Sequence, residues 1–250
     1  MRRIIIAHLV AVLAIPVFAT PIVAIEFVRV ELGIIVRPVK YPCPVNPKTS
    51  KWAANDWDTH VVIHQRDVKA GDRAIAEVSV PNGKVFSQTA TWRDSFGRGC
   101  TWLFVPILGT DAEAWLGTWH ASISLNDKKV AEVSWEVTPA REGTFGEYQA
   151  YLAGNPKSAY AHYRVGAAAA FVGQDALGES ELKEATKLEP TWWYPHLALG
   201  RLYQRLGEKD LALEQFQFLK GLLLGRPAEE GSFTQYVQTM LEDHFKELEK

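Results

Sequence analysis

The sequence predicts a two-domain protein, in which an all-β sandwich is followed by an all-α array of paired helices. Between residues 26 and 138 the apolar positions alternate with a period of two, which indicates half-buried strands. Farther along, the apolar period becomes that of an amphipathic helix, about 3.6 residues. In this second part Gly166 and Gly173 recur 34 residues later as Gly200 and Gly207. Repetition at a fixed interval of this size is typical of stacked helical units.

The size and charge of the chain narrow the class of protein. Its 250 residues are enough for two domains, and 47% of them are hydrophobic, which is sufficient for a packed core. The formal net charge is −2, with no long run of one sign. A nucleic-acid-binding protein needs a basic surface to displace counterions, so we expect no nucleic-acid partner.

Residues 1–24 have the composition of a secretory signal. Arg2 and Arg3 precede an uncharged apolar stretch that runs from Ile4 to Phe18, and small residues follow at a typical cleavage position. The alternative is an uncleaved membrane anchor, because residues 4–25 carry no charge and are almost long enough to span a bilayer. We therefore expect a periplasmic or secreted protein, with anchoring in the inner membrane as the alternative.

Cys43 and Cys100 are the only cysteines, and an even number in an exported chain suggests a disulfide. The alternative is two unrelated thiols. A structural zinc site would need two further ligands, so we expect neither a metal nor any other cofactor.

The β-sandwich is expected over residues 25–138, with about seven strands, a number typical of such sandwiches. In its first strand Val28, Val30 and Leu32 should share the inner face. Asn82 and Gly83 suit a hairpin turn that requires positive φ angles. The prolines beside Cys43 exclude a central strand there, so we expect a loop joined to the sandwich.

A second hairpin closes this domain, from Gly117 to Val137, with its turn at Asn126 and Asp127. Alternate residues on its two strands are apolar and face inward, including Trp119. This hairpin resembles the closing hairpin of exported bacterial immunoglobulin-like domains. The resemblance covers some twenty residues.

After a linker at residues 139–146, the helical array is expected over residues 147–226. It contains a partial repeat at 147–158 and full repeats at 159–192 and 193–226, and residues 227–250 form a capping helix. The period and the order of residues resemble the tetratricopeptide repeat. The matching residues are Gly166, Ala169, Gly173, Ala185 and Pro190 in the first copy, and Gly200, Tyr203, Gly207, Ala212 and Phe216 in the second.

This chain also departs from the repeat pattern. His162 and His196 occupy the usual tryptophan position, Gly178 replaces a small alanine, and Leu224 stands in place of the closing proline.

In the family that the repeats resemble, the first helix of each pair lines a concave groove that binds a peptide or a helix. The resemblance places eight residues in this groove: Tyr160, Tyr163, Ala167, Phe171, Tyr194, Leu197, Arg201 and Arg205. Aromatic rings with two arginines one turn apart suit an apolar or acidic segment. Alternatively, the arginines are solvated and the tyrosines pack on the neighbouring domain. Homo-oligomerisation through the array is a further alternative.

The sequence contains no serine-hydrolase elbow, no HExxH motif and no phosphate-binding glycine loop, so we expect a non-catalytic protein. His60 and His64 would lie about 13 Å apart along a strand, too far to share a metal. The alternative function is a carbohydrate- or envelope-binding sandwich whose helical array serves oligomerisation. This alternative requires Trp52, Trp57 and Trp115 to form an exposed platform.

Overall fold

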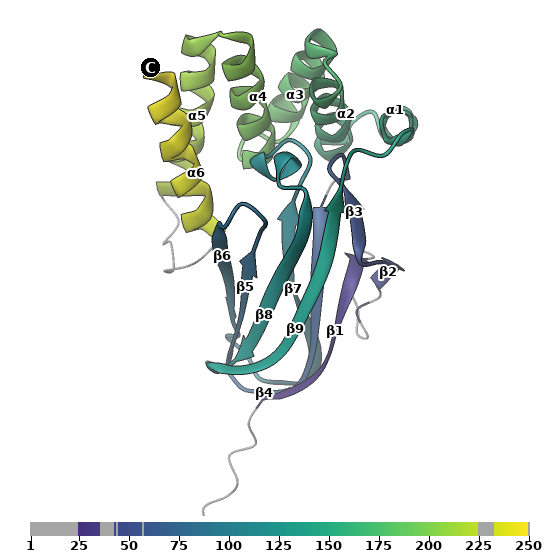
Figure 1. Ribbon diagram of the computed structural model, residues 1–250, viewed down its shortest axis with the longest axis vertical. Helices are drawn as coiled ribbons and strands as arrows, with labels where there is room; N and C mark the ends of the chain where they lie inside the picture. Colours follow the sequence, from purple (N-terminus) through teal and green to yellow (C-terminus); the bar gives the residue numbers. More distant parts are fainter. Residues whose placement is uncertain (1–24, 36–42, 44, 57, 225–232, 250) are drawn as a thin grey trace, which may run out of the picture.

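The computed structural model describes residues 25–35, 43, 45–56, 58–224 and 233–249. Strands form the N-terminal half and helices the C-terminal half, and the helices lie across one end of the strands (Figure 1). The expected signal or anchor, residues 1–24, lies outside the described residues. Within the described ranges, every helix is too short or too polar to cross a bilayer.

The strands form two sheets. One has the order β2-β1-β4-β7, and the other has the order β3-β9-β8-β5-β6. All pairs are antiparallel except β3 with β9. The strands are β1 (Glu26–Ile35), β2 (Val45–Lys48), β3 (Lys51–Ala53), β4 (Asp58–Val68), β5 (Arg73–Ser79), β6 (Val85–Thr91), β7 (Phe96–Pro106), β8 (Gly117–Leu125) and β9 (Lys128–Thr138).

The sheets pack face to face through the alternating apolar residues. Trp119 and Ile123 of β8 and Val78 of β5 are completely buried between them. The prediction that Val28 of β1 faces inward was wrong, because this side chain is exposed. An irregularity between Phe27 and Arg29 shifts the register, so that Phe27 packs against the core in its place.

Two of the turns differ in how well the sequence predicted them. Asn126 and Asp127 both adopt positive φ angles between β8 and β9, as a tight hairpin requires. Between β5 and β6 only Gly83 does so, which corrects the expectation for Asn82.

A disulfide joins Cys43 to Cys100 of β7, with Cα atoms 6.3 Å apart. Cys43 and Val45 cover Val62 on the outer face of the four-stranded sheet. The residues after Cys43 form β2 rather than the expected loop. This strand contains Pro47 and lies at the edge of its sheet, where the missing amide hydrogen interrupts no ladder.

The helical half contains α1 (Thr144–Gly154), α2 (Ala159–Phe171), α3 (Asp175–Leu188), α4 (Trp193–Leu206), α5 (Lys209–Leu224) and α6 (Phe233–Leu248). Helix α2 pairs with α3 and α4 with α5, and neighbouring helices continue the stack (Figure 1). Helix α1 begins inside the expected linker, at Thr144.

The repeated glycines have two separate roles. Gly166 and Gly200 lie where the helices of a pair approach closely, and a Cβ atom there would overlap Leu182 or Phe216 respectively. Gly173 and Gly207 follow the first helix of each pair with φ angles of 82° and 79°. This left-handed conformation ends the helix and favours glycine.

His162 and His196, which are 34 residues apart, make equivalent contacts in the structure. His162 Nε2 lies 3.0 Å from the Pro156 carbonyl and its Nδ1 lies 2.6 Å from Glu181. His196 makes the same pair of contacts with Pro190 and Gln215. Each ring therefore joins the chain before its own helix to the second helix of the pair.

The two halves share a buried core. The Tyr148 hydroxyl of α1 donates to the Asn55 carbonyl at 2.9 Å, and the Tyr163 hydroxyl of α2 donates to the Leu108 carbonyl at 2.7 Å. Leu108 belongs to the same buried cluster as the apolar residues of α2 to α6. The segment between β7 and β8 is thus inserted into the helical half.

Candidate functional site

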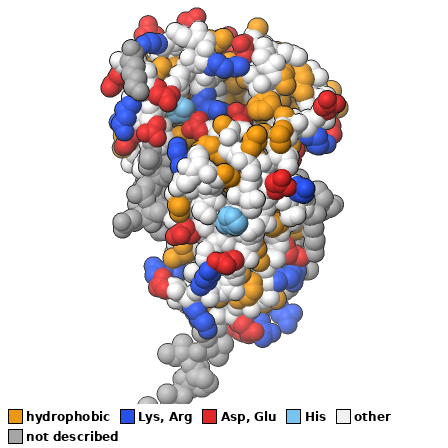
Figure 2. Space-filling model, viewed as in Figure 1, with side chains coloured by type: hydrophobic (Ala, Val, Ile, Leu, Met, Phe, Trp, Pro, Cys, Tyr) orange, Lys and Arg blue, Asp and Glu red, His pale blue; other side chains and the backbone are white. Residues whose placement is uncertain are grey.

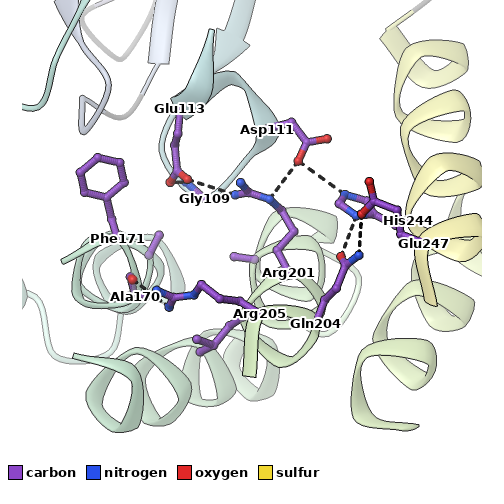
Figure 3. Close-up of a pocket in the computed structure, with 13 residues that line it drawn as sticks. Gly109, Asp111, Glu113, Ala170, Phe171, Arg201, Gln204, Arg205, His244 and Glu247 are labelled. Carbon is purple, nitrogen blue, oxygen red and sulfur yellow. Dashed lines mark hydrogen bonds and ion pairs between the residues drawn. The ribbon is translucent and has the colours of Figure 1, made fainter. Parts of the chain in front are cut away.

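A hollow of about 450 Å³ lies where α2, α4 and α6 meet the segment between β7 and β8 (Figure 3). We call it the junction hollow. It is lined by Gly109, Asp111, Glu113, Ala167, Ala170, Phe171, Ala198, Arg201, Leu202, Gln204, Arg205, His244 and Glu247. Its lining is apolar along α2, mixed along α4, and mainly polar along α6 and the inserted segment.

The inserted segment has a defined local structure. Gly109 has a φ angle of 79°, and a Cβ atom there would lie 2.5 Å from the Tyr163 hydroxyl. The Thr110 hydroxyl then accepts from the Ala112 amide and caps a short 3-10 helix, η1 (Asp111–Ala114). Glycine permits both the close approach and the turn, so the acidic residues of η1 point at α4.

Arg201 of α4 meets two carboxylates of η1. Its Nε lies 3.0 Å from Asp111 Oδ1, and its Nη1 donates to Glu113 Oε2 at 3.2 Å. Glu113 also accepts from the Gly109 amide at 2.6 Å. The guanidinium is about three-quarters buried, and these contacts compensate its lost hydration.

Burial affects the two carboxylates differently. For Glu113, burial is the largest influence and raises its pKa, despite the nearby charge of Arg201. Burial alone would also raise the pKa of Asp111, but the neighbouring His244 and Arg201 outweigh it and lower the pKa. Asp111 is therefore the better stabilised anion of the two.

A chain of polar groups continues from α4 to α6 (Figure 3). Glu247 accepts from the Gln204 side-chain amide at 2.8 Å, and Gln204 Oε1 lies 2.8 Å from His244 Nδ1. The His244 ring stacks on Phe216, with ring centres 4.8 Å apart. Its Nε2 faces Asp111 Oδ1 at 3.5 Å.

Four of the eight residues expected in the groove line the junction hollow: Ala167, Phe171, Arg201 and Arg205. The other four do not. Tyr163, Tyr194 and Leu197 are buried, and Tyr160 is half-buried against Tyr151 and Trp192. The inserted segment contacts Tyr163, so the open surface is shorter than the repeat resemblance implied.

The chain itself already pairs the two arginines expected to attract an acidic segment. Besides the contacts of Arg201, Arg205 donates to the Ala170 carbonyl at 2.9 Å and to Asp175 at 2.5 Å. An acidic partner would have to compete with these groups. On the face that Figure 2 shows, charged side chains of both signs are interspersed over the helical half.

Sequence analysis missed most of the polar lining. The chain places Asp111 and Glu113 about 90 residues before Arg201, and no local pattern links them. His244 did carry a signal, since it interrupts the apolar stripe of the last helix between Met240 and Leu248. A histidine at a core position is a candidate for a polar contact.

The structure does not support the tryptophan platform. Trp52 and Trp115 are 3% and 7% exposed and belong to the sandwich core, so they cannot stack on a sugar ring. Trp57 lies outside the described residues. Among the described residues, no three histidine, cysteine or acidic side chains are grouped to bind a metal ion.

No family model and no curated protein matches this chain. Among solved structures, the chain is similar to the crystal structure of MamA protein, with 18% identity and a TM-score of 0.32 over 42% of the chain. The chain spans 60% of the length of that protein. It is also similar to an immunoglobulin-like protein from Pseudomonas aeruginosa, with 14% identity and a TM-score of 0.30. That match covers 45% of this chain and 95% of the other.

Proposed function

We propose that this protein is an exported, non-catalytic interaction scaffold that binds a segment of a partner protein in the junction hollow. In this proposal the helical half is a short tetratricopeptide array, and the immunoglobulin-like sandwich fixes the array's orientation and closes one end of its groove. The 34-residue spacing of matched glycines and histidines supports the first assignment.

The junction hollow is the single observation that carries the function. It lies on the first helices of the repeats, the surface that such arrays use for recognition. Its volume of about 450 Å³ is within the range of ligand sites in proteins. Its walls come from both halves, and the contacts of Tyr163 and Arg201 hold them in place. A rigid surface of this kind loses little entropy on binding.

The disulfide supports the exported location, because such bonds persist mainly in oxidising compartments. We propose the periplasm or the extracellular space. Treatment of intact cells with an impermeant thiol-modifying reagent, before and after reduction, tests this location. Modification of Cys100 only after cell lysis would contradict it.

The binding function is tested by two matched substitutions at the end of α2. Phe171 lines the junction hollow, whereas the next residue, Val172, is 51% exposed and lies outside it. We expect Phe171→Glu to abolish retention of a partner from envelope extracts, because the new carboxylate must be desolvated against apolar walls. Val172→Glu should retain that partner at the level of the unmodified protein.

The comparison is made by quantitative mass spectrometry of proteins retained by equal amounts of each folded variant. Circular dichroism spectra establish beforehand that both variants keep the helical content of the unmodified protein. Identical sets of retained proteins for the two variants would exclude the hollow as the binding site.

A further inference from the structure

At the polar end of the junction hollow, one nitrogen of His244 faces a carboxylate. Gln204 gives its amide hydrogen to Glu247, so its carbonyl oxygen is the group that faces His244 Nδ1. The ring must therefore carry its proton on Nδ1 to donate to Gln204. In the neutral ring, the second nitrogen, Nε2, is then an acceptor, whereas in the charged ring its proton faces Asp111 and lowers the pKa of that carboxyl.

This second nitrogen has no hydrogen-bond partner within the described part of the chain, although His244 is only 8% exposed. Asp111 Oδ1, another acceptor, faces it at 3.5 Å, which is too long for a good hydrogen bond. His244 also lines the neighbouring hollow of about 470 Å³. A buried acceptor without a donor is costly, and a donor from a ligand would satisfy it.

The charges around the hollow favour a cationic donor. Asp111, Glu113 and Glu247 line it, and a fourth carboxylate, Asp175, pairs with Arg205 at its edge. Arg201 pairs with Asp111 and Glu113, and Arg205 pairs with Asp175, whereas Glu247 forms no ion pair within the described part of the chain. A cationic group from a ligand would be the partner that Glu247 lacks.

The apolar end of the hollow indicates the side from which a cationic ligand group enters. Ala170 and Phe171 of α2 are only partly buried and form the opposite wall from His244 and Glu247 (Figure 3). The neighbouring hollow is bordered by Lys84 and Lys246, which would repel a cation approaching from that side. Entry over α2 avoids these lysines and places an apolar group against Phe171.

We propose that the hollow binds the partner through a lysine or arginine side chain whose head lies between His244, Asp111 and Glu247, with an apolar neighbour against Ala170 and Phe171. This inference rests on the proposed function and specifies the chemistry of the bound segment. It differs from the acidic segment that the sequence suggested, because the chain's own carboxylates already pair with both arginines.

The test uses a phage-displayed library of random short peptides, selected on the purified full chain. We expect the enriched peptides to share a lysine or arginine next to an apolar residue. Two variants remove the charge of Glu247 or the nitrogen acceptor of His244 and keep the surrounding packing. Glu247→Gln keeps an oxygen for Gln204, and His244→Phe keeps an aromatic ring on Phe216.

Each variant should weaken binding of an enriched peptide by about tenfold or more, the loss expected for a charge-assisted hydrogen bond. Replacing the lysine of the peptide by norleucine should give a similar loss. Glu242→Gln is the matched control, because Glu242 is exposed on the same helix and does not line either hollow. It should bind as the unmodified protein does. Fluorescence anisotropy measures the dissociation constant of each of these protein and peptide pairs.

Two outcomes separate this inference from the proposed function. If peptides are enriched and Phe171→Glu abolishes their binding, but they lack a basic residue or ignore Glu247→Gln, the inference is wrong and the function stands. If the peptides bind Phe171→Glu unchanged, or no peptide is enriched, the hollow is not a binding site and both proposals fail.

Discussion

Arg201 shows how single residues of the two halves depend on one another. Its guanidinium is held between Asp111 and Glu113, which belong to the sandwich half, while its own helix belongs to the array. Removing one member of a buried charge group leaves the others poorly compensated. Because the pKa of Asp111 is lowered and that of Glu113 is raised, the two carboxylates should contribute differently to stability.

Substituting the two carboxylates should give opposite pH dependences. The lowered pKa of Asp111 means that its stabilisation is present at neutral pH and is lost as the pH falls through the folded-state pKa. The raised pKa of Glu113 means that its contribution is largest in acid and decreases as the pH rises through the folded-state pKa.

Urea denaturation between about pH 3 and pH 7 measures this difference. The stability deficit of Asp111→Asn should grow with pH in the lower part of the range, to about 1–2 kcal/mol. The deficit of Glu113→Gln should shrink as the pH rises in the upper part. Parallel pH profiles for the two variants would show that the two carboxylates have equivalent surroundings.

Gly109 is the residue that lets the inserted segment approach α2. Alanine there would adopt a φ angle of 79° and overlap the Tyr163 hydroxyl. We expect Gly109→Ala to lower the free energy of unfolding by about 2 kcal/mol, as strain and overpacking combine. Gly143 has a similar φ angle, 83°, but nothing lies near its Cβ position. The control variant Gly143→Ala therefore measures the cost of the backbone strain alone. Equal losses for both variants would exclude the steric contribution of Tyr163.

At the scale of elements, the helical pairs depend on close approach at one position in each repeat. At Gly200 an added Cβ atom would overlap Phe216, which is completely buried. We expect Gly200→Ala to lower the free energy of unfolding by about 1–3 kcal/mol, because Phe216 cannot move without opening the pair.

Gly221 provides the matched control for this substitution. It lies inside α5 with nothing near its Cβ position, so Gly221→Ala should stabilise the protein by about 0.5–1 kcal/mol through helix propensity. Thermal unfolding followed by circular dichroism measures both variants. A loss of stability in Gly221→Ala, or a gain in Gly200→Ala, would contradict the packing of α4 against α5.

Local patterns explain which elements the sequence could predict. The helix pairs and the closing hairpin follow from spacing and turn residues, such as Gly207 and Asn126, which act over a few neighbours. The register shift at Phe27 is set by pairing with β4, which no local pattern records. The short strand β3 was missed for the same reason, since its partner β9 is distant in sequence. The strand β2 was missed because the prolines beside Cys43 indicated a loop.

The candidate site was predictable only in part. Resemblance to a helical repeat placed Phe171, Arg201 and Arg205 on the concave surface, and these residues do line the hollow. It did not show that the sandwich fills the same surface near Tyr163. That contact depends on how the two halves dock, which is a property of the whole molecule and not of the repeat.

At the scale of the whole molecule, the two halves should unfold together. They share the buried cluster around Leu108, the contacts of Tyr148 and Tyr163, and the charges around Arg201, while α6 packs against β6. We expect a single calorimetric transition whose calorimetric and van't Hoff enthalpies agree. Two resolved transitions would show that the halves are independent domains.

The most direct test of the central claim, that the junction hollow binds a partner, is photo-crosslinking in intact cells. The photoreactive amino acid benzoylphenylalanine is introduced at Phe171, inside the hollow, or at Val172, beside it and exposed. We predict that irradiation joins position 171 to one defined protein and that position 172 gives no such adduct. The same adduct from both positions, or from position 172 alone, would contradict the claim.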